Sequence, residues 1–496
     1  MASAMAFKCN NLRLTGQGCS ADHREKTTMN MLRSGLLALM LPLASSSLAQ
    51  TDYPIQTNPK SGGEGSVAQS DHNAYSLPQA NLAMSERLNF SVGNSFFRNP
   101  WVIAPASTDA RDGLGPLFNT NSCQGCHIKD GRGHPHEPGE PPVSIFLRLA
   151  VLGDPDENAE AIRQHGFIPA PVYGTQLQTA AIPGMEPEAD LLLEWKEREE
   201  KLADGTVVKL REPVFTIENP RYGPLPEGLL TSPRVAPPMI GLGLLEAIPE
   251  EDILAAEDPD DRDGNGISGR ANRVWDKATK TSGVLGRFGL KAAEPNVMQQ
   301  SMGAFAGDMG LTSTLAPHTD CTPEQGCERF PNGGDIEVSD KIANFVGFYA
   351  SSLAVPERRD MDDMDVQKGA KLFNEAGCAA CHTPRYVTGQ VNGRPDLSGQ
   401  EIWPYTDLLL HDMGPGLADN RPEFLANGQE WRTAPLWGVG LAQLINPRAG
   451  FLHDSRARTL EEAILWHGGE AQAAKEVYRA LDAQQRATLI RFLESL

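Results

Sequence analysis

Two short stretches of this chain combine residue types that can hold a redox cofactor. Residues 123–127 read Cys-Gln-Gly-Cys-His, and residues 378–382 read Cys-Ala-Ala-Cys-His. In the C-x-x-C-H pattern two thiols add to the vinyl groups of a porphyrin, and the adjacent imidazole binds the iron. Both stretches therefore predict covalent haem c, with one haem at each. The residues predicted to bind the two haems are Cys123, Cys126, His127, Cys378, Cys381 and His382.

Chance and zinc binding are the two alternatives to haem for this pattern, and the sequence favours neither. A structural zinc site takes four ligands from paired knuckles. Here each C-x-x-C is followed directly by a histidine, and no second C-x-x-C lies within knuckle distance. The pattern also occurs twice in a chain with 8 cysteines and 11 histidines, which chance does not account for.

Length and charge narrow the classes of protein that fit. A chain of 496 residues can form two or three domains with substantial cores. Its formal net charge of −20 argues against nucleic acid or an anionic membrane as partner. The same charge would attract a small basic electron carrier such as a cytochrome c. Because no apolar stretch is long enough to cross a bilayer, we do not expect a membrane-embedded enzyme.

The N-terminal region has the pattern of an export signal. A charged residue precedes an apolar run at 36–41, and Ser-Leu-Ala at 47–49 matches a small-residue cleavage site. We therefore expect a periplasmic protein whose mature chain lacks residues 1–49. Residues 50–75 are rich in Gly, Ser, Asn and Gln and are predicted to form a linker.

The expected roles of the cysteines, in haem attachment and in a disulfide, are consistent with an exported protein. Haem attachment to C-x-x-C-H takes place outside the cytoplasm, where disulfides also persist. Cys321 and Cys327 flank a short Thr-Pro-Glu-Gln-Gly turn, so we expect a disulfide between them. A free pair of thiols is the alternative.

A glycine and a phenylalanine four positions apart precede each haem stretch, and in the second copy they lie closer to the cysteines. Gly369 and Phe373 lie one helical turn apart before the second stretch, as in the first helix of a cytochrome c. Gly93 and Phe97 repeat this spacing before the first stretch. A glycine there admits close helix packing, and an aromatic residue covers the porphyrin. An ordinary helix with the same two residues remains the alternative.

Helical periodicity also dominates the second half of the chain. Apolar residues over 342–353 predict a helix that opens the second haem domain, and an amphipathic helix over 482–496 would close it. The fold class predicted is mainly α, with two cytochrome c-like haem domains at 76–335 and 336–496. A β-rich insertion is predicted in the first of them.

This β-rich insertion is predicted at about 141–237. Residues 144–149 have strand composition, and the segments 191–198 and 206–210 flank an Asp-Gly turn at 204–205 that is typical of a hairpin. Since the insertion contains no cluster of ligand residues, we expect it to be structural or to dock a partner.

A calcium-type loop follows the insertion. Asp261, Asp263 and Asn265 occupy the first, third and fifth positions of an EF-hand-like loop, glycine occupies the sixth, and Ile267 would contribute its carbonyl. The twelfth position is Asn272 instead of the bidentate glutamate. The loop therefore predicts either a calcium site or an Asx-rich turn without metal.

Several further motifs make the chain resemble a known family. It is similar to the bacterial di-haem cytochrome c peroxidases, and more closely to their di-haem oxidoreductase branch, which is also labelled thiol oxidoreductase. The resemblance covers about residues 82–496. The motifs that carry it are DGLGPLF at 112–118, GRFG at 286–289, DMG at 308–310, LLLHDMG at 408–414, WRTAPLWG at 431–438, FLHD at 451–454, TLEEA at 459–463 and WHGGE at 466–470.

The resemblance implies a second ligand for the C-terminal haem iron. In the peroxidases this ligand follows the histidine of the F-H-D-G motif by fourteen positions, which leads from His453 to His467. The peroxidases usually have methionine there. Histidine instead implies a lower reduction potential, because methionine raises it. Met413 is the alternative ligand, and a helix histidine bonded to a carbonyl is the structural alternative for His467.

The resemblance also implies a catalytic carboxylate at Asp308, beside the N-terminal haem. Peroxide reduction needs a group that takes a proton from one oxygen and gives one to the other. Arg287 or Lys291 would stabilise the charge that develops as the O–O bond breaks. Asp308 could instead serve a turn or a helix cap. Position 290, where an aromatic residue is expected to help electron transfer, is Leu290. The remaining candidates for that role are Trp431, Trp437 and Trp466.

Three functions are compatible with these features. The favoured one is a periplasmic di-haem oxidoreductase of peroxidase type, which takes electrons at the C-terminal haem and reduces peroxide or another oxidant at the N-terminal haem. The second is a pure electron-transfer cytochrome, in which His134 or His136 would complete the coordination of the first iron. The third, a thiol oxidase, is disfavoured because no free C-x-x-C remains to exchange disulfides.

Overall fold

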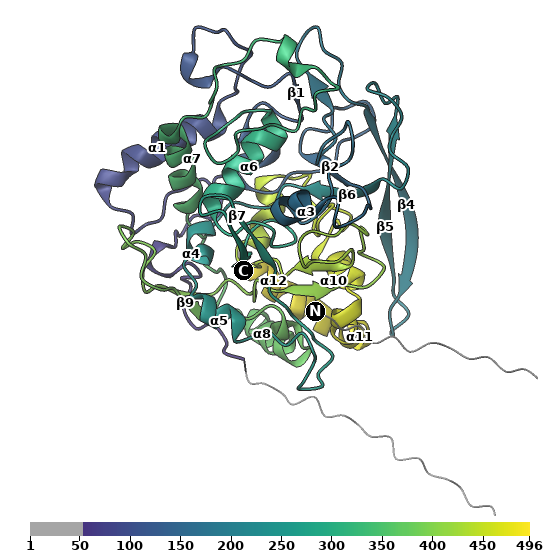
Figure 1. Cartoon of the computed structure of the whole chain (residues 1–496). Helices are drawn as coiled ribbons and strands as arrows, with labels where there is room; N and C mark the ends of the chain where they lie inside the picture. Colours follow the sequence, from purple (N-terminus) through teal and green to yellow (C-terminus); the bar gives the residue numbers. More distant parts are fainter. Residues whose placement is uncertain (1–52) are drawn as a thin grey trace, which may run out of the picture. The chain divides into compact units, whose positions relative to one another are not determined.

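Short helices and loops alternate along the chain in the computed structural model, which describes residues 53–496 (Figure 1). The export signal predicted at 31–50 lies outside the described residues. The α-helices are α1 (Arg87–Arg98), α2 (Cys123–Cys126), α3 (Ala159–His165), α4 (Leu242–Glu246), α5 (Glu250–Leu254), α6 (Val297–Met309), α7 (Asp340–Ser351), α8 (Met364–Glu375), α9 (Ala442–Ile445), α10 (Leu460–Trp466), α11 (Gln472–Ala480) and α12 (Ala483–Ser495).

The strands pair two by two, and every pair is antiparallel. The pairs are β1 (Leu117–Phe118) with β3 (Ala180–Ala181), β2 (Ile145–Ala150) with β6 (Leu230–Val235), β4 (Asp190–Lys201) with β5 (Val207–Glu218), β7 (Arg273–Asp276) with β8 (Thr281–Leu285), β9 (Tyr386–Val387) with β10 (Glu401–Ile402), and β11 (Leu410–Asp412) with β12 (Glu430–Arg432).

The prediction of a mainly α chain is wrong. Among the described residues, 29% are helical and 18% lie in strands or bridges. The physical reason is composition: with 48 glycines and 37 prolines the chain interrupts its helices often, and α2, α4, α5 and α9 span one turn or little more. Helical periodicity in the sequence therefore marks a few anchoring helices, and loops and small sheets connect them.

Two helix pairs, α1 with α7 and α8 with α12, are built in the same way. At the crossing of α1 and α7, a Cβ atom on Gly93 would lie 2.1 Å from the carbonyl oxygen of Phe345. At the crossing of α8 and α12, a Cβ atom on Gly369 would lie 2.3 Å from the carbonyl oxygen of Thr488. Both contacts are closer than any side chain allows, so each glycine is required by its neighbouring helix.

Helix α7 therefore pairs with α1, whereas its periodicity was interpreted as the start of the second haem domain. Its N-terminus is capped by Ser339, and its apolar face, including Val346 and Tyr349, packs in the core around α1 and α6. Helical periodicity alone predicts a helix but not its partner. The predicted division into domains at 335/336 stays a prediction.

The predicted β-hairpin is confirmed, and it is longer than expected. Strands β4 and β5 pair over twelve residues each and form the long ribbon in Figure 1. At the turn, Asp204 accepts a hydrogen bond from Thr206 N at 2.9 Å, and Gly205 has φ +89°. Arg211 and Arg479 connect the ribbon to the C-terminal half, through the carbonyl groups of Arg456 and Lys201 respectively.

Separate apolar cores lie under the two helix pairs. One contains Phe97, Trp101 and Phe305 between α1, α6 and α7, and the thiol of Cys123 packs against it. Another surrounds α8, α10 and α12, and Cys378 packs against that one. Each predicted haem stretch therefore lies at the edge of its own core.

Two further sequence features can be compared with the structure. The predicted disulfide between Cys321 and Cys327 is present, with the Cα atoms 6.3 Å apart. Within residues 53–496, no helix is long and apolar enough to cross a membrane.

Candidate functional site

The first pair of thiols lies on a single helical turn. Ser122 caps α2, where its hydroxyl accepts a hydrogen bond from Gly125 N at 3.2 Å. A helical turn puts residues three apart on one face, so Cys123 and Cys126 are presented together. Neither forms a disulfide, and burial raises the pKa of the Cys123 thiol to about 12. Both thiols are therefore protonated and unbridged, as covalent attachment of a cofactor requires.

His127 directly follows this turn with a fixed ring orientation. Its Nδ1 donates a hydrogen bond to the carbonyl oxygen of Pro237 at 2.7 Å. Burial lowers its pKa to about 4, so the ring is neutral near pH 7. A neutral imidazole that donates through Nδ1 keeps its Nε2 lone pair, which is the form that binds a metal. The ring of Phe97 lies 6.2 Å from that of His127.

The second stretch repeats this arrangement. His382 donates from Nδ1 to the carbonyl oxygen of Tyr405 at 3.0 Å, and the ring of Phe373 lies 6.3 Å away. Burial again lowers the pKa of the histidine to about 4. Cys378 and Cys381 are again unbridged. The two stretches therefore share helix pairing, phenylalanine contact, thiols and histidine tautomer.

His467, the predicted second ligand of the C-terminal iron, lies near His382, and its role as a ligand stays a prediction. It ends α10, and its Nδ1 donates to the carbonyl oxygen of Ala463 at 2.7 Å. This is the carbonyl contact expected for a purely structural histidine, but it leaves Nε2 free, as in His127 and His382. His467 also contributes to the lowered pKa of His382, so the two rings share one environment. Met413 packs against the same core and stays the alternative ligand.

Asp308 lies beside the thiols of the first stretch. It is near the end of α6, and its carbonyl oxygen accepts hydrogen bonds from Asn119 N at 2.8 Å and Thr120 N at 3.1 Å. Its carboxylate charge raises the pKa of both Cys123 and Cys126. Burial raises the pKa of Asp308 itself, while Gln176 donates to its Oδ1 at 2.9 Å. The structure therefore brings Asp308 to the N-terminal site.

Arg287 and Lys291 do not accompany Asp308. Arg287 donates to the carbonyl oxygens of Leu245 and Ile248, the latter at 2.8 Å. Lys291 is fully buried and forms an ion pair of 2.8 Å with Asp419. Because both cations are engaged elsewhere in the fold, the role in charge stabilisation predicted for them has no geometric support.

The cation that does approach Asp308 is Arg148, which was not predicted from the sequence. It lies on β2 and faces Gln176 across an antiparallel bridge. Its Nη1 lies 3.8 Å from the position that a Cβ atom on Gly307 would occupy, and its charge lowers the pKa of Asp308. Alternation along β2 could have marked Arg148, since it lies opposite the face buried by Leu147 and Leu149.

This duplicated set of thiols and histidines agrees with the comparison to protein families. The family model described as "Di-haem oxidoreductase, putative peroxidase" matches residues 56–496. The chain belongs to the di-haem oxidoreductase family. No curated protein sequence matches it.

One solved structure is weakly similar to this di-haem oxidoreductase. It is hydrazine synthase from Kuenenia stuttgartiensis, pressurised with xenon, which has 16% identity in a match covering 39% of this chain and 70% of its own. The TM-score is 0.22, which is too low to support any conclusion about fold or function.

Buried indole N–H groups without hydrogen-bond partners are consistent with one haem in each half of the oxidoreductase. The indole N–H groups of Trp101, Trp403 and Trp466 are buried and have no hydrogen-bond partner among the described residues. Trp101 belongs to the core beside Cys123, and the other two belong to the core beside Cys378. A buried donor without a partner is costly, and a carboxylate such as a haem propionate would satisfy it. The residues present therefore fit one haem in each half.

A charged cluster next to Cys381 was also not predicted. His411 is buried between Asp407, 2.8 Å from its Nε2, and Glu470, 2.7 Å from its Nδ1. Cys381 Sγ lies 3.6 Å from Nδ1 of His411. Burial alone would lower the pKa of His411, but Asp407 and Cys381 together raise it well above its ordinary value. These four residues span positions 381 to 470, so no local pattern could have revealed the cluster.

His134 and His136, the alternative ligands of the first iron, lie in the segment that follows the first haem stretch. His134 Nδ1 contacts Asn446 Nδ2 at 3.0 Å, and burial lowers the pKa of both histidines. The contact with Asn446 ties His134 to the C-terminal half. Coordination of iron by either histidine stays a prediction.

Among the predicted electron-transfer tryptophans, Trp431 has the most distinctive contacts. Its ring stacks on that of His453 at 3.9 Å with an interplanar angle of 12°, and Lys291 Nζ lies 4.6 Å from its centroid. Trp466 belongs to the same core, whereas Trp437 belongs to another. The contribution of these residues to electron transfer stays a prediction.

The predicted calcium loop folds as a series of Asx turns. Asp261 accepts a hydrogen bond from Gly266 N at 3.0 Å, Asp263 accepts one from Asn265 N at 3.0 Å, and Asn265 accepts one from Ile267 N at 2.7 Å. In residues 53–496, no three His, Cys, Asp or Glu side chains are grouped as a metal site. Calcium binding stays a prediction, which a melting curve after chelation would test.

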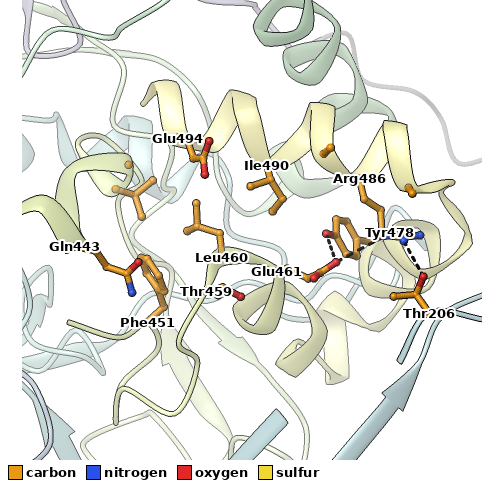
Figure 2. A pocket seen from close by; sticks show the side chains of 14 residues that line it. Thr206, Gln443, Phe451, Thr459, Leu460, Glu461, Tyr478, Arg486, Ile490 and Glu494 are labelled. Atoms are coloured by element: carbon orange, nitrogen blue, oxygen red, sulfur yellow. Dashed lines mark hydrogen bonds and ion pairs between the residues drawn. The ribbon is translucent and has the colours of Figure 1, made fainter. Parts of the chain in front are cut away.

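A surface pocket of about 480 Å³ lies apart from both haem stretches (Figure 2). Figure 2 shows Tyr478, which donates to Glu461 at 3.0 Å, and Arg486 at one end of the pocket. Further residues of α12, residues of the segment 439–451, and Thr459 and Leu460 line the remainder. No residue predicted to hold haem, or to act in catalysis, lines this pocket.

Proposed function

We propose that this di-haem oxidoreductase is a peroxidase with divided roles for its two haems. Peroxide or another oxidant would be reduced at the N-terminal haem, with electrons that enter at the C-terminal haem. The observation that carries this proposal is Asp308, whose carboxyl group lies near Cys123 and Cys126 and hydrogen-bonds Gln176. In the C-terminal half a second histidine, His467, lies close enough to His382 to affect its pKa.

The histidines give this division its physical basis. When bound, haem supplies an iron that can bind an oxidant and can pass electrons one at a time. His382 and His467 would hold the second iron from two histidines, while His127 would hold the first from one. A doubly ligated iron can only pass electrons, whereas an iron with an open position can also bind an oxidant.

Asp308 would move the proton that peroxide cleavage requires. Reduction of hydrogen peroxide consumes two electrons and two protons and gives two water molecules. One oxygen loses a proton while the leaving oxygen gains one, and a carboxyl group near both can do each step. The raised pKa of Asp308 suits proton donation, and the bond from Gln176 stabilises the carboxylate between the two steps. Arg148 takes the charge-stabilising role that was predicted for Arg287 and Lys291.

The partner and compartment follow from charge and chemistry. The net charge of −20 supports a small basic electron carrier as donor, and the export signal and covalent haem c support a periplasmic location. The pairing of α1 with α7 supports a domain junction after α7, between about 352 and 363, instead of at 335/336.

Replacing one oxygen of the carboxyl group tests the proposal. We expect Asp308→Asn to slow the reaction with peroxide by roughly 10²- to 10⁴-fold, because the amide cannot relay a proton. Stopped-flow absorption of the half-reduced protein would measure the rate, and a haem count would show that both haems remain. Asp340→Asn, a change of an exposed aspartate on α7, is the matched control. An Asp308→Asn protein that reacts at the wild-type rate would contradict the proposal.

A further inference from the structure

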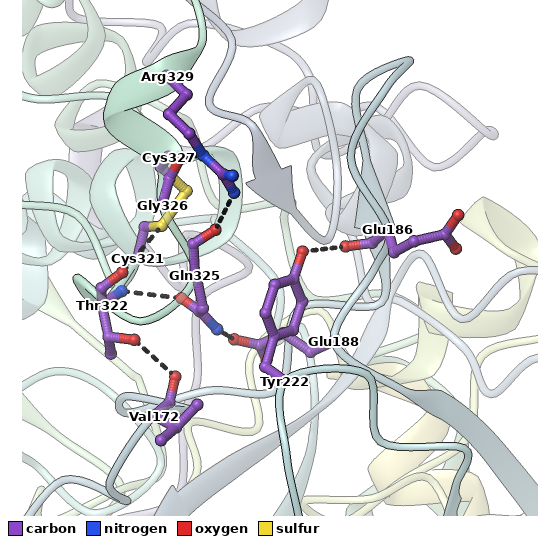
Figure 3. Close-up of a disulfide and its surroundings, with 10 residues drawn as sticks. All are labelled: Val172, Glu186, Glu188, Tyr222, Cys321, Thr322, Gln325, Gly326, Cys327 and Arg329. Carbon is purple, nitrogen blue, oxygen red and sulfur yellow. Dashed lines mark hydrogen bonds between the residues drawn. A yellow bond between two sulfur atoms is a disulfide. The ribbon is translucent and has the colours of Figure 1, made fainter.

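A short series of hydrogen bonds connects the disulfide-closed loop to Asp308. Cys321 and Cys327 close a loop in which Gln325 Oε1 accepts a hydrogen bond from Thr322 N at 2.8 Å (Figure 3). Thr322 Oγ1 donates outward to the carbonyl oxygen of Val172 at 2.9 Å. The loop is therefore internally ordered, and it is anchored to the segment just before residue 175.

Two carboxyl groups join this loop to the segment 175–178. Asp320, the residue before Cys321, accepts hydrogen bonds from Thr175 Oγ1 at 2.7 Å and from Thr175 N at 3.2 Å. Glu188 is fully buried; it accepts from Gln178 N at 2.6 Å and from Gln325 Nε2. Figure 3 shows Gln325 pointing from the loop toward Glu188. Each end of the segment is therefore held by one carboxyl group.

The segment in turn holds the end of α6 that carries Asp308. Gln176 Nε2 donates to Asp308 Oδ1 at 2.9 Å, and Gln178 Nε2 donates to the carbonyl oxygen of Gly307 at 2.8 Å. Both glutamines are buried, and their Oε1 atoms have no partner within the described residues. Gln176 Nε2 also donates to Asn119 Oδ1 at 2.6 Å, which fixes the side chain between α6 and the segment before the first haem stretch. A displacement of the segment 175–178 would therefore move the donor that Asp308 receives.

We propose that the disulfide-closed loop 321–327 positions the carboxyl group of Asp308, through Asp320 and Glu188 and the segment that they hold. Thr175, Glu188 and Gln325 are positioning residues in this scheme, since none of them contacts the reacting atoms. The inference rests on the proposed function of Asp308 and adds the element that orients it.

The loop benefits from its disulfide because most of it lies outside any helix or strand. Residues 320–327 contain one 3-10 turn, η5 (Cys327–Arg329), at their end, and the remainder is irregular. A crosslink removes alternative conformations of such a segment. Small displacements of a catalytic group cost large factors in rate, about 10²-fold for 1 Å. Opening the disulfide should therefore affect catalysis more than it affects haem content.

The test compares variants of the loop and of the segment in the haem-loaded full chain. Cys321→Ser/Cys327→Ser opens the loop, and Thr175→Val removes one hydroxyl while keeping the side-chain shape. Thr175→Ser keeps the hydroxyl and should restore wild-type behaviour. Glu186→Gln, a change of an exposed carboxylate in the same stretch as Glu188, is the matched control.

Three measurements separate positioning from a general loss of structure. For the loop-opened protein and Thr175→Val we expect kcat for peroxide to fall about 10- to 100-fold, with KM changed less than about 3-fold. The pH midpoint of the N-terminal haem spectrum should rise by about 1 unit, because Asp308 loses a hydrogen bond to its ionised form. Amide hydrogen exchange of residues 175–188 should become faster.

Two outcomes are decisive. If the loop-opened protein keeps the wild-type pH midpoint and the wild-type exchange of residues 175–188, the loop does not position Asp308 and the inference is overturned. If the wild type itself does not react with peroxide, the proposed function fails. In that case the pH midpoint and the exchange rates still decide whether the loop orients Asp308.

Discussion

The two halves of this oxidoreductase share the C-x-x-C-H pattern and differ in the pKa of their buried acids. In the first half, burial raises the pKa of Asp308, Asp320 and Glu188, so these groups hold protons at higher pH. In the second half, the pKa of Asp454 and of Glu470 is lowered, although burial opposes it, because His453, Arg456 and His411 lie beside them. Burial therefore favours the protonated form of these acids in the first half, whereas neighbouring cations favour the ionised form of the acids in the second half.

This difference matches the proposed division of labour. Peroxide reduction consumes protons, so the half proposed to carry it out would benefit from acids with a raised pKa, of which Asp308 lies close to the thiols. Electron entry consumes no protons. In the second half, the ion pairs of Asp454 and Glu470 and the two histidines would keep their arrangement when the charge of the iron changes. In this account the common module of glycine, phenylalanine and C-x-x-C-H would attach a haem in each half, and the surrounding residues would decide what that haem does.

The largest expected effect is the loss of one haem when the cysteines of one C-x-x-C-H stretch are replaced. Cys378→Ser/Cys381→Ser should reduce the haem content from two to one, because each site has its own thiols and histidine. Cys123→Ser/Cys126→Ser should do the same for the other haem. A pyridine haemochrome assay after acid-acetone extraction measures the number that remains bound. Loss of both haems from either variant would show that the halves do not load independently.

The second largest expected effect is a loss of stability at the close crossing of α8 and α12. Gly369→Ala should destabilise the protein by about 2–3 kcal/mol, since its Cβ atom would lie 2.3 Å from the carbonyl oxygen of Thr488. Gly303→Ala on α6 is the control, because the nearest atom to its Cβ would be 3.7 Å away. Denaturant unfolding of both variants measures the free energies. Equal stabilities would mean that the crossing is not tightly packed.

The buried acids predict opposite pH dependences in the two halves. Burial raises the pKa of Glu188 from 4.5 to about 8, so between these values the folded protein keeps a proton that the unfolded chain has lost. The stability contributed by Glu188 is therefore present below pH 4.5 and is lost as the pH rises toward 8, by up to about 1.4 kcal/mol per pH unit.

Unfolding of Glu188→Gln across this range tests the sign, because the amide does not titrate and the decline should become shallower. Glu470→Gln is the contrasting variant. The pKa of Glu470 is lowered, so it contributes stability above its unfolded pKa and loses it in acid. An unchanged slope in Glu188→Gln would contradict the assignment of a proton to that group.

Sequence spacing predicted the features whose members are neighbours along the chain. The two C-x-x-C-H stretches, the Cys321–Cys327 disulfide and the Asp-Gly hairpin each lie within a short segment, so local geometry decides them. The prediction of the fold class was wrong for a related reason. Periodicity identifies single helices and does not reveal the loops and small sheets between them.

Contacts between distant residues could not be read from spacing. Gln176 meets Asp308 across 132 positions, and Lys291 is neutralised by Asp419 across 128. An isolated sequence offers no reason to pair either couple, so Lys291 was predicted to be catalytic and Arg148 was overlooked. The family resemblance supplied His467 and Asp308, which no periodicity would have selected.

Low-temperature EPR of the fully oxidised protein tests the central asymmetry most directly. We predict one high-spin iron from the N-terminal site and one low-spin iron from the C-terminal site, with His467→Ala converting the low-spin signal to high-spin. Two low-spin signals in the wild type, unchanged by peroxide even after partial reduction, would contradict the division of roles and identify a plain electron carrier instead.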